Sequence, residues 1–192
     1  MESDRERWDR KFAAGEGPSH FRPKPFLSQH AHLLGTGRAL DIACGFGGNA
    51  LYLASLGYQV DAIDVSGVAL AQAHAEAKRR GLSLNLVQAD LGHWWVPPRR
   101  YDVILVFFYL NRELISRLAE GLRLGGLLFQ ANRNTNYLAI RPSFDREYLL
   151  LPGELQQLAL AAGLEMVHYG EEPPGEGYNS QLIARRPTEP DR

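Results

Sequence analysis

The chain has 192 residues, of which 45% are hydrophobic and 22% are charged, and its formal net charge is −1. This balance is that of an ordinary globular domain, and the length predicts a single domain over residues 1–192. A net charge near zero gives no field that would recruit nucleic acid or a membrane surface. No apolar run approaches the roughly 18 residues that span a bilayer. The charged start MESDRERWDRKF resembles neither a signal nor a transit peptide, so we expect a cytoplasmic protein.

Short apolar runs alternate with helical patterns from Arg38 onward, while residues 1–37 contain no clear strand and are expected to form a cap or lid. The His20–Pro25 segment is expected to be a proline-punctuated loop. In chain order we predict a strand over 38–43, a helix over 49–56, a strand over 59–63, a helix capped by Ser66 that reaches Arg80, strands over 84–88 and 101–108, a helix capped by Asn111 that ends at Gly121, a strand over 126–131, a helix over 155–162, and strands over 164–169 and 179–185.

This alternation predicts an α/β fold with a doubly wound, mostly parallel sheet. The last two strands follow the last helix with only a loop between them, so they should form an antiparallel hairpin. The long irregular stretch from Asn132 to Leu151 is of a kind that usually has a function. Cys44 is the single cysteine, which excludes an internal disulfide, and the scattered histidines predict no metal site.

A glycine cluster, Gly45, Gly47 and Gly48, follows the first predicted strand. Glycine lets the backbone turn tightly and approach a ligand where a side chain would collide. Doubly wound sheets bind ligands at the carboxyl ends of their strands. The pattern Gly45-x-Gly47-x-x-Ala50 also satisfies the loose dinucleotide fingerprint, and a bare structural turn is a third interpretation. Asp64, at the end of the second strand, could accept hydrogen bonds from ribose hydroxyls in either ligand class.

Two further carboxylates separate these interpretations. Asp41 lies inside the first predicted strand, where a dinucleotide fold normally keeps an apolar residue, and a buried carboxylate is costly unless something satisfies it. Ordering the amides of the glycine loop and meeting a ligand ammonium would do so. Asp90 closes the third strand and could accept from an adenine amino group, although it could instead be a helix N-cap. Together Asp41, Asp64 and Asp90 predict a pocket for an adenosine with an amino-acid tail.

These residues carry a resemblance to the class I S-adenosylmethionine-dependent methyltransferases. The matching segments are DIACGFGG (41–48), Asp64, QADL (88–91), YDVILV (101–106) and LRLGG (122–126), in which Leu124 replaces the usual proline. The resemblance covers residues 38–186 and implies a Rossmann-like core there. It implies a seven-stranded sheet, mostly parallel with an antiparallel last strand, and helices on both faces.

The resemblance also implies a cofactor, S-adenosyl-L-methionine, which leaves as S-adenosyl-L-homocysteine. Val65 and Ala89 would flank the adenosine, and the backbone near Val106 and Phe107 would face the methionine part. The expected cofactor-binding set is Asp41, Gly45, Gly47, Asp64, Val65, Ala89, Asp90, Leu91, Val106 and Phe107.

Within this family the chain is similar to the tellurite-resistance and thiopurine-type small-molecule branch. The similarity lies in GNALYLASLGYQVDAIDVS (48–66) and LLPGELQQLALAAGL (150–164), and WDRKF (8–12) resembles the branch's opening segment, which folds over the cofactor. The C-terminal His-Arg pair of the tellurite enzyme has no counterpart, so tellurite is not the expected substrate. No Asp-Pro-Pro-Tyr or Asn-Pro-Pro-Tyr motif follows the fourth strand, which disfavours nucleobase amines.

The acceptor is expected to lie near Tyr109, Asn132 and Arg133. Tyr109 could orient an acceptor or simply pack on the next helix, and Arg133 could hold an anionic substrate or be solvated. Methyl transfer chiefly requires that acceptor and methyl group be held in line, so no catalytic residue is assigned.

Three functions remain open. The sequence favours methyl transfer to a small molecule by in-line displacement, by a monomer or homodimer. The alternatives are an NAD(P)-dependent oxidoreductase, favoured only by the glycine pattern, and a non-catalytic module that binds S-adenosylmethionine.

Overall fold

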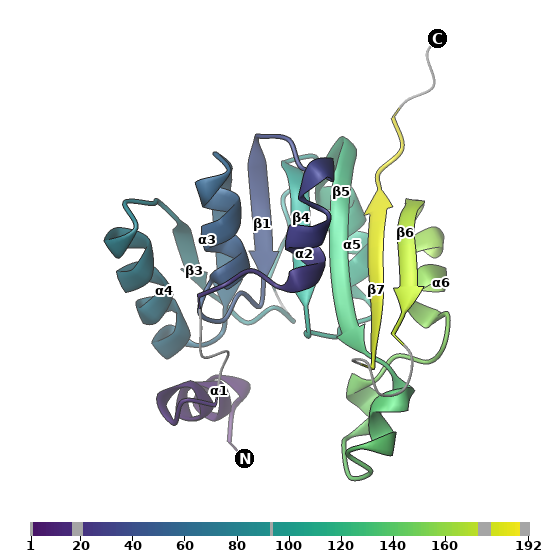
Figure 1. The fold of residues 1–192 in the computed structure, drawn as a ribbon, viewed down its shortest axis with the longest axis horizontal. Coiled ribbons are helices and arrows are strands. Elements are labelled where there is room, and N and C mark those ends of the chain that lie inside the picture. The colour runs from purple at the N-terminus through teal and green to yellow at the C-terminus, as the bar shows by residue number, and fades with distance from the viewer. Residues whose placement is uncertain (1, 17–20, 93, 173–177, 189–192) are drawn as a thin grey trace. The chain divides into compact units, whose positions relative to one another are not determined.

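The computed structural model describes residues 2–16, 21–92, 94–172 and 178–188 (Figure 1). Contacts divide the chain into two compact units, Met1–Trp95 and Val96–Arg192, so each unit is described by itself. The expected single domain over 1–192, with a cap over 1–37 and a core over 38–186, stays a prediction. All seven predicted strands form and belong to one mixed sheet, which confirms the predicted fold class. Among the described residues, no helix is both long and apolar enough to cross a membrane.

The first unit contains three parallel strands, with β2 (Gln59–Asp64) between β1 (Arg38–Ile42) and β3 (Asn85–Gln88). Helices α3 (Gly48–Ser55) and α4 (Gly67–Arg79) pack against these strands. As predicted, the Ser66 hydroxyl accepts from the N–H of Ala69 and caps α4. The carboxyl ends of β1 and β2 therefore meet the amino ends of α3 and α4 at one edge of the unit.

The segment before β1 contains three helical elements among its described residues and no strand. It forms α1 (Asp4–Ala13), α2 (Pro25–Gln29) and the short 3-10 helix η1 (Ala31–Leu33). Ser3 and Glu6 form a capping box at the start of α1, and α1 packs against α4. The expected loop over His20–Pro25 is wrong at its end, because Pro25 is the first residue of α2, where its missing N–H costs nothing. His20 lies outside the described residues.

The second unit contains β4 (Tyr101–Phe107), β5 (Leu122–Arg133), β6 (Glu165–Glu171) and β7 (Asn179–Arg185). β4 and β5 are parallel, and β7 is antiparallel to both β5 and β6, which confirms the predicted hairpin and the reversed last strand. Helices α5 (Leu114–Gly121) and α6 (Glu154–Ala161) pack against these strands, and the 3-10 helices η2 (Thr135–Ala139) and η3 (Arg146–Tyr148) follow β5. Residues 173–177 of the hairpin loop lie outside the described part.

The structure of this unit differs from the prediction chiefly at three places, and the other boundaries agree within two residues. β5 begins at Leu122 instead of residue 126, because Leu122 pairs with Tyr101 and a register shift between Tyr101 and Val103 accommodates the extra residues. Asn111 caps the turn before α5 instead of the helix itself, since its side chain accepts from the N–H groups of Glu113 and Leu114. The supposedly irregular stretch over 132–151 begins inside β5, which runs to Arg133, and contains η2 and η3.

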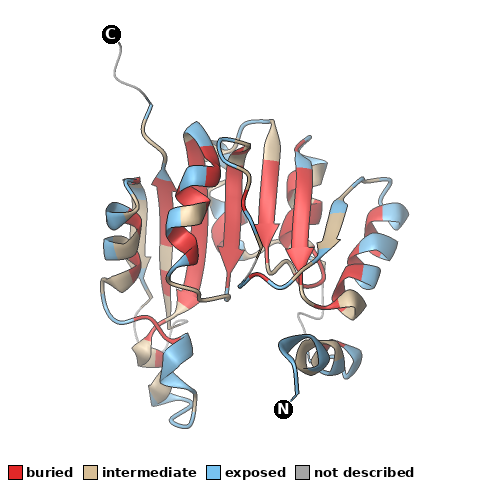
Figure 2. Cartoon of the chain, turned by 180° about the vertical axis from the view of Figure 1, so that it is seen from behind, coloured by how far each residue is buried: buried red, intermediate tan, exposed pale blue. Residues whose placement is uncertain are grey.

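The strands carry most of the buried surface in each unit (Figure 2). Six of the seven residues of β4 are buried, as predicted for a strand covered on both faces. β3 is half-exposed along its length, as an edge strand would be.

Candidate functional site

The turn that follows β1 has an unusual backbone. Ala43, Gly45 and Gly47 have φ values of +54°, +53° and +73°, in the left-handed region that glycine adopts freely and alanine does not. A Cβ on Gly47 would lie 3.1 Å from the Cβ of Ala73, so this glycine is also required by the packing of α3 against α4. Strain of this kind concentrates at ligand sites, and here it is held in the segment where the sequence predicts the cofactor loop.

Asp64 holds this turn in place. Its Oδ2 accepts from the N–H of Gly45 over 2.8 Å, and its Oδ1 accepts from the N–H of Ser66 over 2.9 Å. The side chain is 5% exposed. Burial raises the pKa of Asp64, while the N–H groups of Ser66, Gly45 and Val65 act against that rise. The expectation that Asp41 orders the loop amides is therefore wrong for Gly45, because the carboxylate of β2 reaches this amide instead.

Asp41 is the least satisfied acid of the first unit. It is 1% exposed, and its Oδ2 has no hydrogen-bond partner among the described residues. Burial raises its pKa to about 8; the N–H of Ala50 and the charge of Lys24 lower it, and the charge of Asp64 raises it. A buried acid with an unpartnered oxygen fits a cationic ligand group, which would supply the missing partner.

Cys44 lies between Asp41 and Asp64 in the chain, and its environment does not activate its thiol. Burial first, and then the charges of Asp41 and Asp64, raise the pKa of its thiol well above the usual value. A thiol in this environment is a poor nucleophile.

Helix α1 is anchored to the start of α4 by a contact that the sequence did not predict. Asp9 Oδ1 accepts from the hydroxyl of Ser66 over 2.5 Å and from the N–H of Val68 over 3.2 Å. These hydrogen bonds, the one from Ser66 foremost, lower the pKa of Asp9. A carboxylate three residues before Phe12 carried no motif that could have marked it as a cap for a helix 57 residues away.

The aromatic residues of α1 pack beside the glycine turn. The ring of Phe12 lies 4.9 Å from that of Phe46 and 5.6 Å from that of Trp8. An added Cβ on Gly45 would meet the Phe12 ring at 3.6 Å. Trp8 and Phe12 therefore anchor α1, and they place the N-terminal segment next to the turn.

The residues expected to flank the adenosine gather at the ends of β2 and β3. The N–H of Ala89 donates to the carbonyl of Asp64 over 3.1 Å, and Gln88 Nε2 donates to the carbonyl of Val65 over 3.0 Å. Leu91 is 5% exposed. Asp90 is exposed and its Oδ1 accepts from the N–H of Gly92 over 2.9 Å, so it closes a turn instead of capping a helix.

In the second unit, the expected site residues follow β4 and β5. Val106 and Phe107 are buried in β4, Phe108 has a φ of +59°, and Tyr109 is half-buried. Asn132 is 2% exposed.

Arg133 is half-buried, and no ion pair joins it to an acid among the described residues. Its guanidinium lies 3.8 Å from the ring centroid of Tyr137 and 5.8 Å from that of Phe108. The contact with the Tyr137 ring restrains a guanidinium whose N–H groups suit an anion. Arg141, by contrast, is exposed and lies 5.6 Å from the ring of Phe144.

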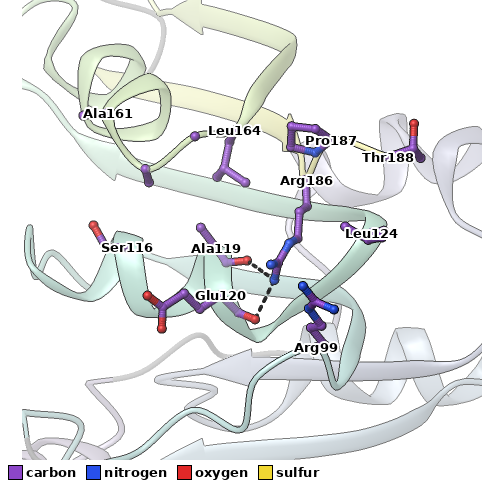
Figure 3. Close-up of a pocket in the computed structure, with 12 residues that line it drawn as sticks. Arg99, Ser116, Ala119, Glu120, Leu124, Ala161, Leu164, Arg186, Pro187 and Thr188 are labelled. Atoms are coloured by element: carbon purple, nitrogen blue, oxygen red, sulfur yellow. Dashed lines mark hydrogen bonds between the residues drawn. The ribbon is translucent and has the colours of Figure 1, made fainter. Parts of the chain in front are cut away.

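A cleft of about 590 Å³ lies elsewhere in the second unit, beside the end of α5 (Figure 3). The guanidinium of Arg186 projects into it and donates from Nη1 to the carbonyls of Ala119, Glu120 and Leu122 over 3.1, 2.7 and 2.7 Å. Leu122 is the first residue of β5, so the cleft is at the amino end of that strand. Ligands of such sheets bind at the other end, and we interpret Arg186 as the C-terminal cap of α5.

No group of three or more metal-binding side chains is found in the described part of the chain.

Known proteins resemble this chain in sequence and in fold. Residues 39–126 match the model of a family described as "Methyltransferase domain". The chain is 29% identical to the ubiquinone biosynthesis O-methyltransferase of Burkholderia thailandensis over 164 residues, 74% of this chain and 70% of that protein. It is 30% identical over 103 residues to a probable S-adenosyl-L-methionine-dependent methyltransferase, TehB, of Haemophilus influenzae, with 50% of this chain and 36% of that protein covered. The crystal structure of Haemophilus influenzae TehB superposes with a TM-score of 0.73 at 18% identity, over 93% of this chain and 67% of that one.

Proposed function

We propose that this chain, which belongs to the class I S-adenosylmethionine-dependent methyltransferases and uses S-adenosylmethionine as its cofactor, methylates a small-molecule acceptor by in-line displacement. The family assignment removes the support for the oxidoreductase alternative, which depended on the glycine pattern alone.

Asp41 carries the proposal for the cofactor site. Its buried and unpartnered Oδ2 requires a donor, and the ammonium of an amino-acid tail is a donor with a positive charge. A nicotinamide dinucleotide has no ammonium to offer at this position. The residues of the glycine turn therefore fit the methionine part of the cofactor.

Asp64 is the proposed acceptor for the ribose hydroxyls. Each of its oxygens already accepts one backbone N–H, from Gly45 and from Ser66. A carboxylate offers about four acceptor positions, so these bonds orient Asp64 without exhausting it. Val65, Ala89, Asp90 and Leu91 surround the end of the neighbouring strand and are proposed to hold the adenosine. Val106 and Phe107 remain assigned to the methionine part by the family resemblance.

The bound cofactor supplies both the methyl group and the leaving group. The contribution of the chain is to orient the acceptor and to exclude water, and orientation alone is worth about 7–11 kcal/mol. We assign no general base.

The acceptor is proposed to be a small molecule, with Tyr109, Asn132 and Arg133 beside it. The name of one relative, a ubiquinone biosynthesis O-methyltransferase, supports a small-molecule acceptor. The stacked guanidinium of Arg133 is suited to hold an anionic part of such a molecule.

The proposal includes a cytoplasmic location and action as a monomer or homodimer, without nucleic acid or membrane. The near-neutral charge supports the exclusion of nucleic acid, and the absence of a long apolar run in the sequence supports the exclusion of a membrane.

Calorimetry with S-adenosylmethionine and with NAD tests the cofactor, and turnover against thiols, thiopurines, phenols and metalloid oxyanions tests the reaction. We expect the protein to bind S-adenosylmethionine and not NAD, and to methylate at least one of these acceptors. Binding without turnover on any acceptor class would favour the non-catalytic module instead.

A further inference from the structure

A row of amide side chains is buried on one face of β5. Gln130, Asn132 and Asn134 follow one another at intervals of two residues, and each is at most 2% exposed. Because side chains two residues apart along a strand point to the same face, Gln130 and Asn132 form one row, and Asn134, the first residue after β5, follows it. Ser180 of β7, which is fully buried, is the register partner of Asn132 and extends the row sideways.

The hydrogen bonds of this row are incomplete. Gln130 Nε2 donates to Asn132 Oδ1 over 3.1 Å, and Asn134 Oδ1 accepts from the N–H of Asn136 over 3.1 Å. Gln130 Oε1 and Asn134 Nδ2 are buried and have no hydrogen-bond partner among the described residues. An unpartnered buried polar atom lowers stability, and an apolar side chain would avoid the loss. A buried glutamine with an unpartnered oxygen departs from the apolar composition that is usual in the core of a sheet. Such departures are expected at binding sites.

The row lies at the end of the strand where a ligand is expected. β5 ends at Arg133, so Gln130 and Asn132 are in its last four residues, at the carboxyl end. Gln130 is the register partner of Val106 on the parallel strand β4, a residue assigned to the methionine part of the cofactor.

The chemistry of the row is neutral. Arg133 lies on the opposite face of β5, because side chains alternate along a strand. An acid, Glu171, is hydrogen-bonded to Ser180 of the row: its Oε1 accepts from the Ser180 hydroxyl over 3.4 Å. Glu171 is engaged elsewhere, since the same oxygen accepts from Tyr169 and from the N–H of Gly153. The atom of Gln130 without a partner is a carbonyl oxygen, which accepts hydrogen bonds.

We propose that Gln130 and Asn132 form the specificity site for an acceptor with a neutral, hydrogen-bond-donating hydroxyl group, such as a phenol. This inference rests on the proposed methyl transfer to a small molecule. A phenol or alcohol donates to Gln130 Oε1 and completes the row. A thiolate or a fully ionised metalloid oxyanion has no proton to donate and leaves that oxygen unpartnered.

The first test separates a binding role from a structural one by stability. In the double variant Gln130→Met/Asn132→Leu both members of the amide pair become apolar side chains of similar shape, a change that is close to neutral when the pair has no structural value. We expect an unfolding temperature equal to or above that of the wild type. Gln157→Leu, an exposed glutamine on α6, is the matched control. A clear drop in the double variant alone would make the pair structural and overturn the proposal.

The second test uses binding, so it does not depend on turnover. With the cofactor site filled by S-adenosylhomocysteine, catechol should shift the side-chain amide signals of Gln130 and Asn132 in 15N-labelled protein, and selenate, which is fully ionised at neutral pH, should not. The signals of this pair are identified by their absence from the double variant. Loss of the hydrogen bond should weaken catechol binding about three- to tenfold in that variant.

Unmoved amide signals, or equal shifts with selenate, would refute the specificity site. If catechol moves the signals but no acceptor of any class is methylated, the specificity site stands and the proposed methyl transfer fails.

Discussion

The turn after β1 and the end of β5 both present buried polar groups, but they are built in different ways. In the turn, the acids Asp41 and Asp64 lie within 24 residues of each other, and a strained backbone and main-chain amides fix Asp64 in place. At the end of β5, neutral amides and a stacked arginine are placed by β5 and by residues that follow it. The first region is suited to a cationic ligand group, and the second is suited to neutral and anionic groups of an acceptor.

The largest expected effect tests the first region through Asp64. Asp64→Ala should lower the affinity for S-adenosylmethionine ten- to hundredfold, because a hydrogen bond to a charged group contributes about 1.5–3 kcal/mol. Calorimetry measures this. Asp61→Ala is the control, since Asp61 is also a buried acid of β2 and accepts from Asn85. Equal losses in both variants would show that the strand, not the carboxylate of Asp64, is what binding requires.

The same contrast explains how much could be predicted from the sequence. The strands, the glycine turn and the capping role of Ser66 follow from local patterns, and the structure has them where predicted. The hydrogen bond from Gly45 to Asp64 joins residues 19 positions apart, and the one from Ser66 to Asp9 joins residues 57 positions apart. Neither could be predicted, because any acid that the fold brings near these donors could accept the same hydrogen bonds. The amide row of β5 gave no signal beyond two polar residues in an apolar run. Its significance depends on burial, which only the folded chain reveals.

A smaller effect is expected at the end of β5. Arg133→Ala should raise the Michaelis constant of a carboxylate-bearing acceptor about tenfold and leave the affinity for S-adenosylmethionine unchanged, as is typical of lost substrate binding. Steady-state kinetics with a phenolic acid and with the corresponding uncharged phenol measures the difference. Arg141→Ala, an exposed arginine, should change neither constant. A parallel fall in cofactor affinity for Arg133→Ala would contradict an acceptor role.

The smallest expected effect concerns the strained turn. A left-handed conformation costs an L-residue about 1–2 kcal/mol, so Ala43→Gly should relieve strain at a φ of +54°. After the entropy cost of glycine, a net stabilisation of up to about 1 kcal/mol remains. Thermal unfolding should show a higher midpoint for Ala43→Gly and a lower one for Ala75→Gly, an exposed alanine in the interior of α4. A lower midpoint for both would mean that the turn stores no strain at Ala43.

The most direct test of the cofactor site is the proton that Asp41 should release on binding. In the free protein its pKa is about 8, so at pH 7 the carboxyl is mostly protonated. A cationic ammonium beside it favours the ionised form and lowers that pKa. The complex then binds fewer protons than the free protein, and affinity should rise about tenfold per pH unit well below pH 8 and level off above it.

Calorimetric titration with S-adenosylmethionine at pH 7, in two buffers with different ionisation enthalpies, counts this proton. We predict that the wild type releases close to one proton more than Asp41→Asn does. Any proton that the ligand's own amino group takes up or releases is common to both proteins and cancels in this difference. Binding with the same proton count in both proteins would contradict the assignment of Asp41 to the cofactor ammonium.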